Sequence, residues 1–108
     1  MSNMIATTKA FYSDVLTDPV AAAKRYLADD FLLENYLPGH IPFGGRYEGR
    51  AGLVQYLSEL SQAIDMGPLD MQAWTGDGTE IVVRGIEKSL VKSTGKIYAM
   101  RFVHWLSF

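Results

Sequence analysis

A histidine near the end of the chain, His104, is the residue best suited to proton chemistry. It belongs to an alternating run in which Met100, Phe102, His104 and Leu106 fall on one face of a strand. Since its three companions are apolar, the pattern predicts that His104 points toward the core. A histidine titrates near neutral pH and acts as an acid, a base or a donor to a ligand carbonyl. Two interpretations stay open: a functional histidine, or a core histidine hydrogen-bonded to backbone.

Other polar residues are weaker candidates for chemistry. His40 lies in a loop rich in proline and glycine, where it either contacts a ligand or faces solvent. Arg84 and Arg101 fall in mid-strand, where each either anchors a ligand carboxylate or forms an ion pair on the outer face. The His, Asp and Glu residues lack metal-ligand spacing, and the absence of cysteine removes thiolate nucleophiles, disulfides and cysteine metal sites. We therefore expect neither a metal nor another cofactor.

Aromatic residues from different segments are candidates to line a ligand cavity. They are Tyr12, Phe43, Trp74 and Phe102. The alternative for each is a place in an ordinary core, where aromatic side chains are common. An apolar pocket and a packed core use the same residue types, so the sequence leaves both interpretations open.

Composition describes a small globular chain and argues against several partners. The chain has 108 residues, a common size for one domain, and 48% of them are hydrophobic. Its net charge is −2, and it lacks the concentrated basic stripe that nucleic-acid binding needs. It shows neither a signal-peptide pattern at the N-terminus nor a stretch of about 18 apolar residues. We expect one cytoplasmic domain, residues 1–108, that binds neither nucleic acid nor a membrane.

Helices are expected in the first half of the chain. Apolar residues recur at helical spacing over 4–16. A second helix, 19–28, is expected to begin with Asp18 as its N-cap and a proline in its first position. A third helix is expected from Gly49 until a glycine–proline pair at 67–68 stops it. The expected inward residues of the second helix are Val20, Ala23 and Leu27.

Strands are expected mainly in the second half. A short aromatic and apolar segment, 31–36, is expected to be the first strand, whereas two prolines and three glycines exclude regular structure from 37–45. The later strands are expected at 69–74, 80–91 and 97–108. Two long antiparallel strands together with three helices predict an α+β fold, with a strongly curved sheet and the helices on one face.

Motifs in three segments match those of a known superfamily. Residues 26–31, Tyr-Leu-Ala-Asp-Asp-Phe, resemble its junction between the second helix and the first strand. Residues 42–50 resemble its entry to the third helix, and 94–96 with 103–105 resemble its penultimate strand. The superfamily is that of nuclear transport factor 2, ketosteroid isomerase and the SnoaL-like polyketide cyclases. The resemblance implies a cone-shaped fold, in which a curved antiparallel sheet packs against three helices and encloses a pocket. By this resemblance the sequence stops before the last strand of the family, so we expect either that the sheet lacks this strand or that the sequence is a shortened piece.

The resemblance locates the positions at which ketosteroid isomerases carry their catalytic residues. Phe11 falls at the position of the catalytic tyrosine, beside Tyr12. Asn35 falls at the position of the aspartate base, with Glu34 next to it as a displaced base or a solvent-facing carboxylate, and Val103 at that of the second acid. An amide cannot serve as a base, and Phe and Val have nothing to donate. The likeness is therefore expected to be one of fold and not of the isomerase mechanism.

The leading hypothesis is a SnoaL-like, ketosteroid isomerase-related protein whose pocket takes a small apolar or cyclic carbonyl compound. Its catalysis would be cofactor-free isomerisation, cyclisation or dehydration, with His104 as proton carrier or carbonyl donor and Asn35 as a hydrogen-bond partner. The alternative is a non-catalytic module of the same fold that binds a ligand or a protein. The residues expected to contact the ligand are Phe11, Tyr12, Glu34, Phe43, Trp74 and Phe102.

Two further expectations concern the surface. Many relatives in this superfamily pair through the outer face of the sheet, where Val103 and Trp105 fall if His104 points inward. We therefore expect a homodimer formed through that face. The glycine-rich loop 39–45 keeps apolar residues, and we expect it to form a mobile rim over the pocket.

Overall fold

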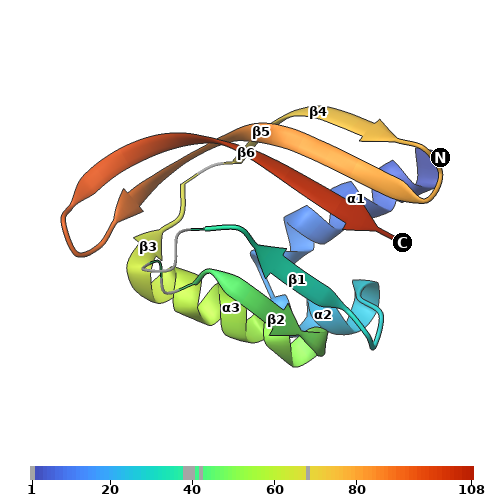
Figure 1. Cartoon of the computed structure of the whole chain (residues 1–108), viewed down its shortest axis with the longest axis horizontal. Helices are drawn as coiled ribbons and strands as arrows, with labels where there is room; N and C mark the ends of the chain where they lie inside the picture. Colours follow the sequence, from blue (N-terminus) through green and yellow to red (C-terminus); the bar gives the residue numbers. More distant parts are fainter. Residues whose placement is uncertain (1, 38–40, 42, 68) are drawn as a thin grey trace. The chain divides into compact units, whose positions relative to one another are not determined.

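The chain has the α+β architecture predicted from the sequence. The computed structural model describes residues 2–37, 41, 43–67 and 69–108, which form three helices and six strands (Figure 1). They belong to two compact units: a helix unit, Ala10–Gln62, and a sheet unit made of Met1–Lys9 and Ala63–Phe108. Within the described ranges, no helix is both long and apolar enough to cross a membrane.

The first two helices, α1 (Ser2–Val15) and α2 (Pro19–Tyr26), are separated by a short turn. Asp18 is the N-cap of α2, as predicted: its backbone is extended, and its carboxylate accepts a hydrogen bond of 3.2 Å from the backbone N–H of Ala21. This bond satisfies one of the backbone donors that a helix leaves unpaired in its first turn. The helix ends at Tyr26, two residues before the predicted end.

The core of the helix unit corrects one prediction for α2. Ala23 is buried as predicted, but Val20 is exposed and the prediction that it points inward is wrong. The buried side of α2 contains both Ala22 and Ala23, and Val20 lies outside the stripe that helical spacing defines from those two residues. The buried residues of this core are Val15, Ala22, Ala23 and Leu53, with Phe11, Tyr26, Leu27, Phe31, Leu33 and Leu57 packed against them.

A two-stranded antiparallel sheet leads into the third helix. It consists of β1 (Leu32–Asn35) and β2 (Gly45–Glu48), so the prediction of irregular structure is wrong at Gly45, which pairs with Asn35. Helix α3 (Gly49–Ala63) starts where predicted, and Gly49 there adopts a φ of 71°, a conformation that favours glycine. Residues 38–40 and 42, which include His40 and much of the expected rim, lie outside the described part of the chain.

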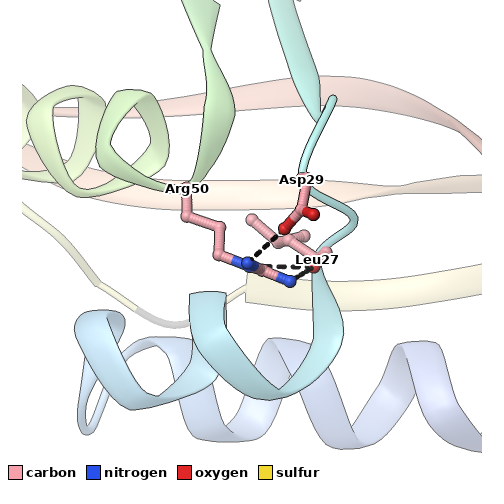
Figure 2. Close-up of polar contacts among 3 residues, drawn as sticks. All are labelled: Leu27, Asp29 and Arg50. Carbon is pink, nitrogen blue, oxygen red and sulfur yellow. Dashed lines mark hydrogen bonds and ion pairs between the residues drawn. The ribbon is translucent and has the colours of Figure 1, made fainter.

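Arg50, in the first turn of α3, is joined to the end of α2 (Figure 2). Its guanidinium donates to the carbonyl oxygen of Leu27 from Nε at 3.1 Å and from Nη2 at 2.8 Å. Its Nη1 also binds the carboxylate of Asp29. Because the last carbonyls of a helix have no partner within it, the side chain acts as a cap for α2 as well as a link between two helices.

The sheet unit is built around β5 (Glu80–Val91), whose bounds are those predicted. Along one edge it pairs with β3 (Ile64–Asp65) and β4 (Leu69–Gly76), and along the other with β6 (Lys96–Ser107), always antiparallel. Strands β5 and β6 bend along their length (Figure 1), which confirms the predicted curvature. The register of β4 shifts between Met71 and Ala73, as it does at a β-bulge.

The short strand β3 corrects the predicted end of the third helix. Ile64, which falls within the predicted third helix, is buried but lies in β3 and pairs with Val91. Pairing with β5 satisfies the backbone of residues 64–65, so the helix stops at Ala63 and not at the glycine–proline pair.

Candidate functional site

The two faces of the β5–β6 ribbon differ in burial. Ile81 and Val83 of β5 are both 0% exposed and pair with Leu106 and His104 of β6. Their face, hereafter the His104 face, is the one that the alternation of the last strand predicts for His104. Its members include Ile81, Val83, Gly85, Glu87 and Ser89 of β5, Tyr98, Met100, Phe102, His104 and Leu106 of β6, and Trp74 of β4.

His104 lies among aromatic and aliphatic neighbours on this face. Its ring centroid is 4.6 Å from that of Phe102, and it pairs with Val83, which pairs on its other side with Trp74. The side chain is partly open to solvent, but the surrounding protein removes enough water to lower the pKa of His104 below the ordinary 6.5. The negative charge of Glu87 opposes this effect. The imidazole is consequently neutral at pH 7, able to donate from one nitrogen and accept at the other.

A polar network on the same face was not predicted from the sequence. The hydroxyl of Tyr98 donates to Oε2 of Glu87 at 2.5 Å, and the hydroxyl of Ser89 donates to the same oxygen at 2.9 Å. The backbone N–H of Gly67 in turn donates to Oγ of Ser89 at 3.1 Å. The signal was present in the alternation of β5, which puts Glu87 and Ser89 on the face of Val83.

Trp74 carries a cationic neighbour from α1. The ammonium of Lys9 lies 5.3 Å from the centroid of the Trp74 ring, within the range of a cation–π interaction. Strand pairing brings three of the residues predicted to form the site together on one face of one sheet: His104, Phe102 and Trp74.

The opposite face of the ribbon contains Val103, the residue at the position of the second acid in the alignment with ketosteroid isomerase. The β5–β6 register runs without a shift from Glu80 opposite Ser107 to Val91 opposite Lys96. With a period of two, Val103 must then face away from His104, and it is 67% exposed. Val103, which falls at the position of the second acid of ketosteroid isomerases, therefore does not share a face with His104. Arg84 and Arg101 are exposed and share this outer face with Val103.

The other predicted site residues lie in the helix unit. The side-chain amide of Asn35 donates to the carbonyl oxygen of Phe43 at 3.2 Å, so these two candidates are in contact. Glu34 is exposed on the side of β1 opposite to Asn35. A role for Asn35, Phe43 or Glu34 toward a ligand stays a prediction.

Phe11 and Tyr12 contact each other in α1. Their rings meet edge to face at 5.7 Å, and Phe11 meets Tyr26 in the same manner at 5.9 Å. Burial raises the pKa of Tyr12 far above its ordinary value, and the nearby Tyr56 adds to this effect, so the hydroxyl keeps its proton at neutral pH. Phe11 packs against the core of the helix unit, which gives it a structural function in addition to any contact with a ligand.

Two hollows are present in the helix unit, and none of the candidate residues lines either of them. One, of about 380 Å³, is lined by Arg46, Tyr47, Glu48, Ala51, Gly52 and Gln55. The other, of about 300 Å³, lies against α1 and α2 and is lined by Ser13, Asp14, Thr17, Asp18, Ala21, Ala22, Arg25 and Tyr26. The pocket expected around His104 therefore stays a prediction. Among the described side chains, no group of three His, Asp or Glu residues could hold a metal ion.

Comparisons with known proteins identify the fold. No protein-family model and no curated protein matches the sequence. Among solved structures, an NTF2-like protein of unknown function from Burkholderia pseudomallei is 22% identical with a TM-score of 0.85, covering 100% of this chain and 82% of that one. A candidate SnoaL-like polyketide cyclase from Mesorhizobium loti is 20% identical with a TM-score of 0.74, and the match covers 96% of this chain and 87% of that one. TerC, co-crystallised with polyporic acid, is 20% identical with a TM-score of 0.80, and the match covers 96% of this chain and 80% of that one.

These likenesses extend along nearly the whole chain, at identities that establish the fold alone. They confirm the fold that the three sequence motifs indicate. The chain has the nuclear transport factor 2-like fold, which it shares with NTF2-like and SnoaL-like proteins.

Proposed function

We propose that the protein binds a small, largely apolar compound with a carbonyl group against the His104 face, and moves a proton on that compound without a cofactor. One observation carries the proposal: a histidine that is neutral at pH 7 lies beside Phe102, on a face that also contains the fully buried Ile81 and Val83. Apolar surroundings with few polar groups are typical of small-molecule sites.

The chemistry follows from the two nitrogens of a neutral imidazole. The nitrogen without a proton accepts one from the carbon beside a ligand carbonyl, and the electron pair of that C–H bond forms an enolate. Return of the proton to another carbon completes an isomerisation, and the same exchange starts a cyclisation or a dehydration. Asn35 cannot take up a proton, so we assign it hydrogen bonding only.

The comparisons support a small-molecule ligand. TerC is co-crystallised with polyporic acid, and another neighbour is a candidate polyketide cyclase. Fold alone does not carry a function from one protein to another. The neighbours therefore support the ligand class, and the chemistry of the His104 face supports the reaction.

A non-catalytic binding module is the second candidate, and two observations favour it. Asn35, at the position of the isomerase base, already donates to the carbonyl of Phe43. Val103, at the position of the second acid, faces away from His104. A protein with neither acid nor base at those positions retains the fold and a binding face without the isomerase reaction.

Proton exchange on a simple cyclic ketone distinguishes these candidates. The protein is mixed with 1-tetralone or polyporic acid, binding is followed by NMR, and loss of the protons beside the tetralone carbonyl is followed in D₂O. The proposal predicts binding and faster exchange, with the exchange lost in His104→Phe and kept in Arg101→Gln, a change on the opposite face. Binding without exchange supports a module that binds a small ligand, and no binding of either compound overturns the proposed function.

We also propose a homodimer formed through the outer face of the sheet. Val103 and Trp105 are 67% and 72% exposed there, and Ile97 lies on the same side of β6. The indole N–H of Trp105 donates to Oε2 of Glu80 at 3.0 Å, which holds this large apolar side chain in one orientation. An exposed, oriented tryptophan beside aliphatic residues is a typical centre of a protein–protein interface.

A further inference from the structure

We infer that Glu87 is a second ligand-binding residue of the His104 face, and that its ligand is a cyclic carbonyl compound with a hydroxyl group at the end remote from the carbonyl. The inference rests on the function proposed above, because it assigns to the same ligand a second polar contact. Its basis is the geometry of the Glu87 carboxylate and of the residues between Glu87 and His104.

The two oxygens of the Glu87 carboxylate have different environments. Oε2 accepts the hydroxyls of Tyr98 and Ser89, and Ser89 is itself held by the backbone N–H of Gly67. These contacts orient the carboxylate. Oε1, in contrast, accepts no hydrogen bond from any residue that the structure describes. One oxygen is thus used to position the group, and the other is available to an external donor.

The surroundings select the kind of donor. Glu87 is half-buried, and its strand continues into Val83 and Ile81, which are fully buried. A ligand ammonium would have to lose its hydration next to this apolar surface, which costs several kcal/mol for an ion. A phenol or enol hydroxyl enters with a much smaller cost and forms a short, charge-assisted hydrogen bond with the carboxylate. We therefore assign the donor to a hydroxyl group.

Residues between the two polar positions indicate the spacing of the ligand groups. Glu87 and Val83, the partner of His104, are four residues apart on β5, which corresponds to about 13 Å between their Cα atoms. Gly85 lies midway, and the Phe102 ring crosses it: Cζ of Phe102 is 2.9 Å from the position that a Cβ of residue 85 would occupy. The ring of Phe102 therefore provides an aromatic surface between the two polar groups. A ligand ring stacked there would have its carbonyl toward His104 and its hydroxyl toward Glu87.

Three probes that differ only in their hydroxyl group test the inference. They are 1-tetralone, 5-hydroxy-1-tetralone, in which the hydroxyl and carbonyl point to opposite ends, and 8-hydroxy-1-tetralone, in which they are adjacent. Dissociation constants are measured by NMR titration. We expect the 5-hydroxy compound to bind about 10-fold more tightly than 1-tetralone, as a hydrogen bond to a charged group implies, and the 8-hydroxy compound to gain nothing.

The variant Glu87→Gln keeps the size of the side chain and removes its charge. We expect it to lose the 10-fold preference, so that it binds 5-hydroxy-1-tetralone and 1-tetralone with similar affinity. The matched control is Glu80→Gln, because the Glu80 carboxylate on the opposite face also accepts two side-chain donors, from Trp105 and Ser107. This control should keep the preference. Tyr98→Phe, which removes one orienting hydroxyl and no charge, should reduce the preference to an intermediate value.

The outcomes separate this inference from the proposed function. If all three probes bind with equal affinity, the function of the His104 face stands and the function of Glu87 is overturned. A preference that survives in Glu87→Gln, or that is lost in Glu80→Gln, likewise overturns the assignment to Glu87. If no probe binds, the proposed function is overturned together with the inference.

Discussion

His104 is subject to two opposing electrostatic effects, and their balance decides what the residue can do. Loss of hydrating water disfavours the imidazolium, while the negative charge of Glu87 favours it. The first effect is the larger, so the ring is neutral at physiological pH. A neutral ring can both donate and accept, whereas an imidazolium can only donate.

The pKa of His104 should be measurable in an NMR titration of its ring protons, assigned by their loss in His104→Phe. We expect a value below the ordinary 6.5. In Glu87→Gln the value should fall further, because the charge that raises it has been removed. A titration at or above 6.5 in the native protein would contradict the proposed protonation state.

The lowered pKa also predicts how stability depends on pH. The unfolded chain binds a proton at His104 below about 6.5, and the folded chain binds it only at a lower pH. The contribution of His104 to the free energy of unfolding is therefore fully present above the pKa of the unfolded chain. It is lost as the pH falls through the lower pKa of the folded chain. Urea denaturation between pH 7.5 and 5 should show a smaller loss of stability in His104→Phe than in the native protein. If the stability of both proteins depended on pH in the same way, the lowered pKa of His104 would be contradicted.

His104→Phe also separates function from packing. Since it keeps most of the ring volume, we expect the free energy of unfolding to change by less than about 1.5 kcal/mol while ligand binding or proton exchange is lost. A core histidine that is hydrogen-bonded to backbone would behave differently, because its removal leaves a buried partner unpaired. A loss of about 3 kcal/mol with ligand binding retained would identify that structural function.

At the scale of elements, side chains that bind backbone groups decide where helices begin and end. Asp18 starts α2, and Arg50 covers the Leu27 carbonyl just beyond its end. Asp77 performs the same task in the turn between β4 and β5, where it accepts the backbone N–H groups of Thr79 and Glu80, which lower its pKa. Each contact satisfies a backbone group that would otherwise lack a partner.

Arg50 and Arg46 provide a matched pair of arginines in the helix unit. Arg50→Met removes two bonds to a backbone carbonyl, and we expect the free energy of unfolding to fall by about 1–2 kcal/mol. Arg46→Met removes only an exposed ion pair with Glu48, which is worth at most about 1 kcal/mol. Equal effects in urea denaturation would mean that the carbonyl bonds add nothing to an ordinary surface ion pair.

Gly85 is required where β4 and β5 approach each other. A Cβ at this position would lie 2.2 Å from the carbonyl oxygen of Asp70 and 2.9 Å from Cζ of Phe102, so Gly85→Ala must displace backbone. We expect it to destabilise the protein by about 2–3 kcal/mol in thermal or urea denaturation. Gly95→Ala is the control: it has open space but a φ of 71°, so its cost should be only about 1 kcal/mol. A smaller loss for Gly85→Ala than for this control would contradict the close approach.

At the scale of the whole molecule, the outer face of the sheet is the surface most in need of a partner. Its exposed apolar residues all lie on β6, a strand that pairs, within the described residues, only with β5. A large exposed aromatic side chain beside aliphatic ones is typical of a protein–protein interface. A second copy of the chain is the occupant we propose.

Light scattering on a sizing column measures this directly. At micromolar concentration we expect twice the mass of one chain, and Val103→Glu should return the mass to that of a monomer, because it puts a charge at the centre of the contact. Tyr36→Glu is the control, since Tyr36 is 90% exposed in the other unit and should leave the dimer intact. A monomeric native protein would rule out the proposed assembly.

Local signals in the sequence predicted much of the element order. The N-cap at Asp18, the start of α3 at Gly49 and both ends of β5 were correct because each depends on a few neighbouring residues. The motifs also identified the fold, which the structural comparisons confirm. Periodicity alone placed His104 on the face of its apolar companions, since a strand alternates whatever its partner is.

Contacts between distant segments decided the rest. Ile64 fits a helical stripe but lies in a strand because Val91 is available to pair with it. Val20 is exposed because the core is centred on Ala22 and Ala23. The eight residues of α2 alone do not specify which side of the helix faces that core. The Glu87 network was not predicted, because its two hydroxyl donors come from β5 and β6, and only the antiparallel register puts Tyr98 opposite Ser89. The sequence by itself determined most of the elements and the face of His104. The short paired strands and the polar partners on that face depend on strand pairing, which joins residues far apart in the chain.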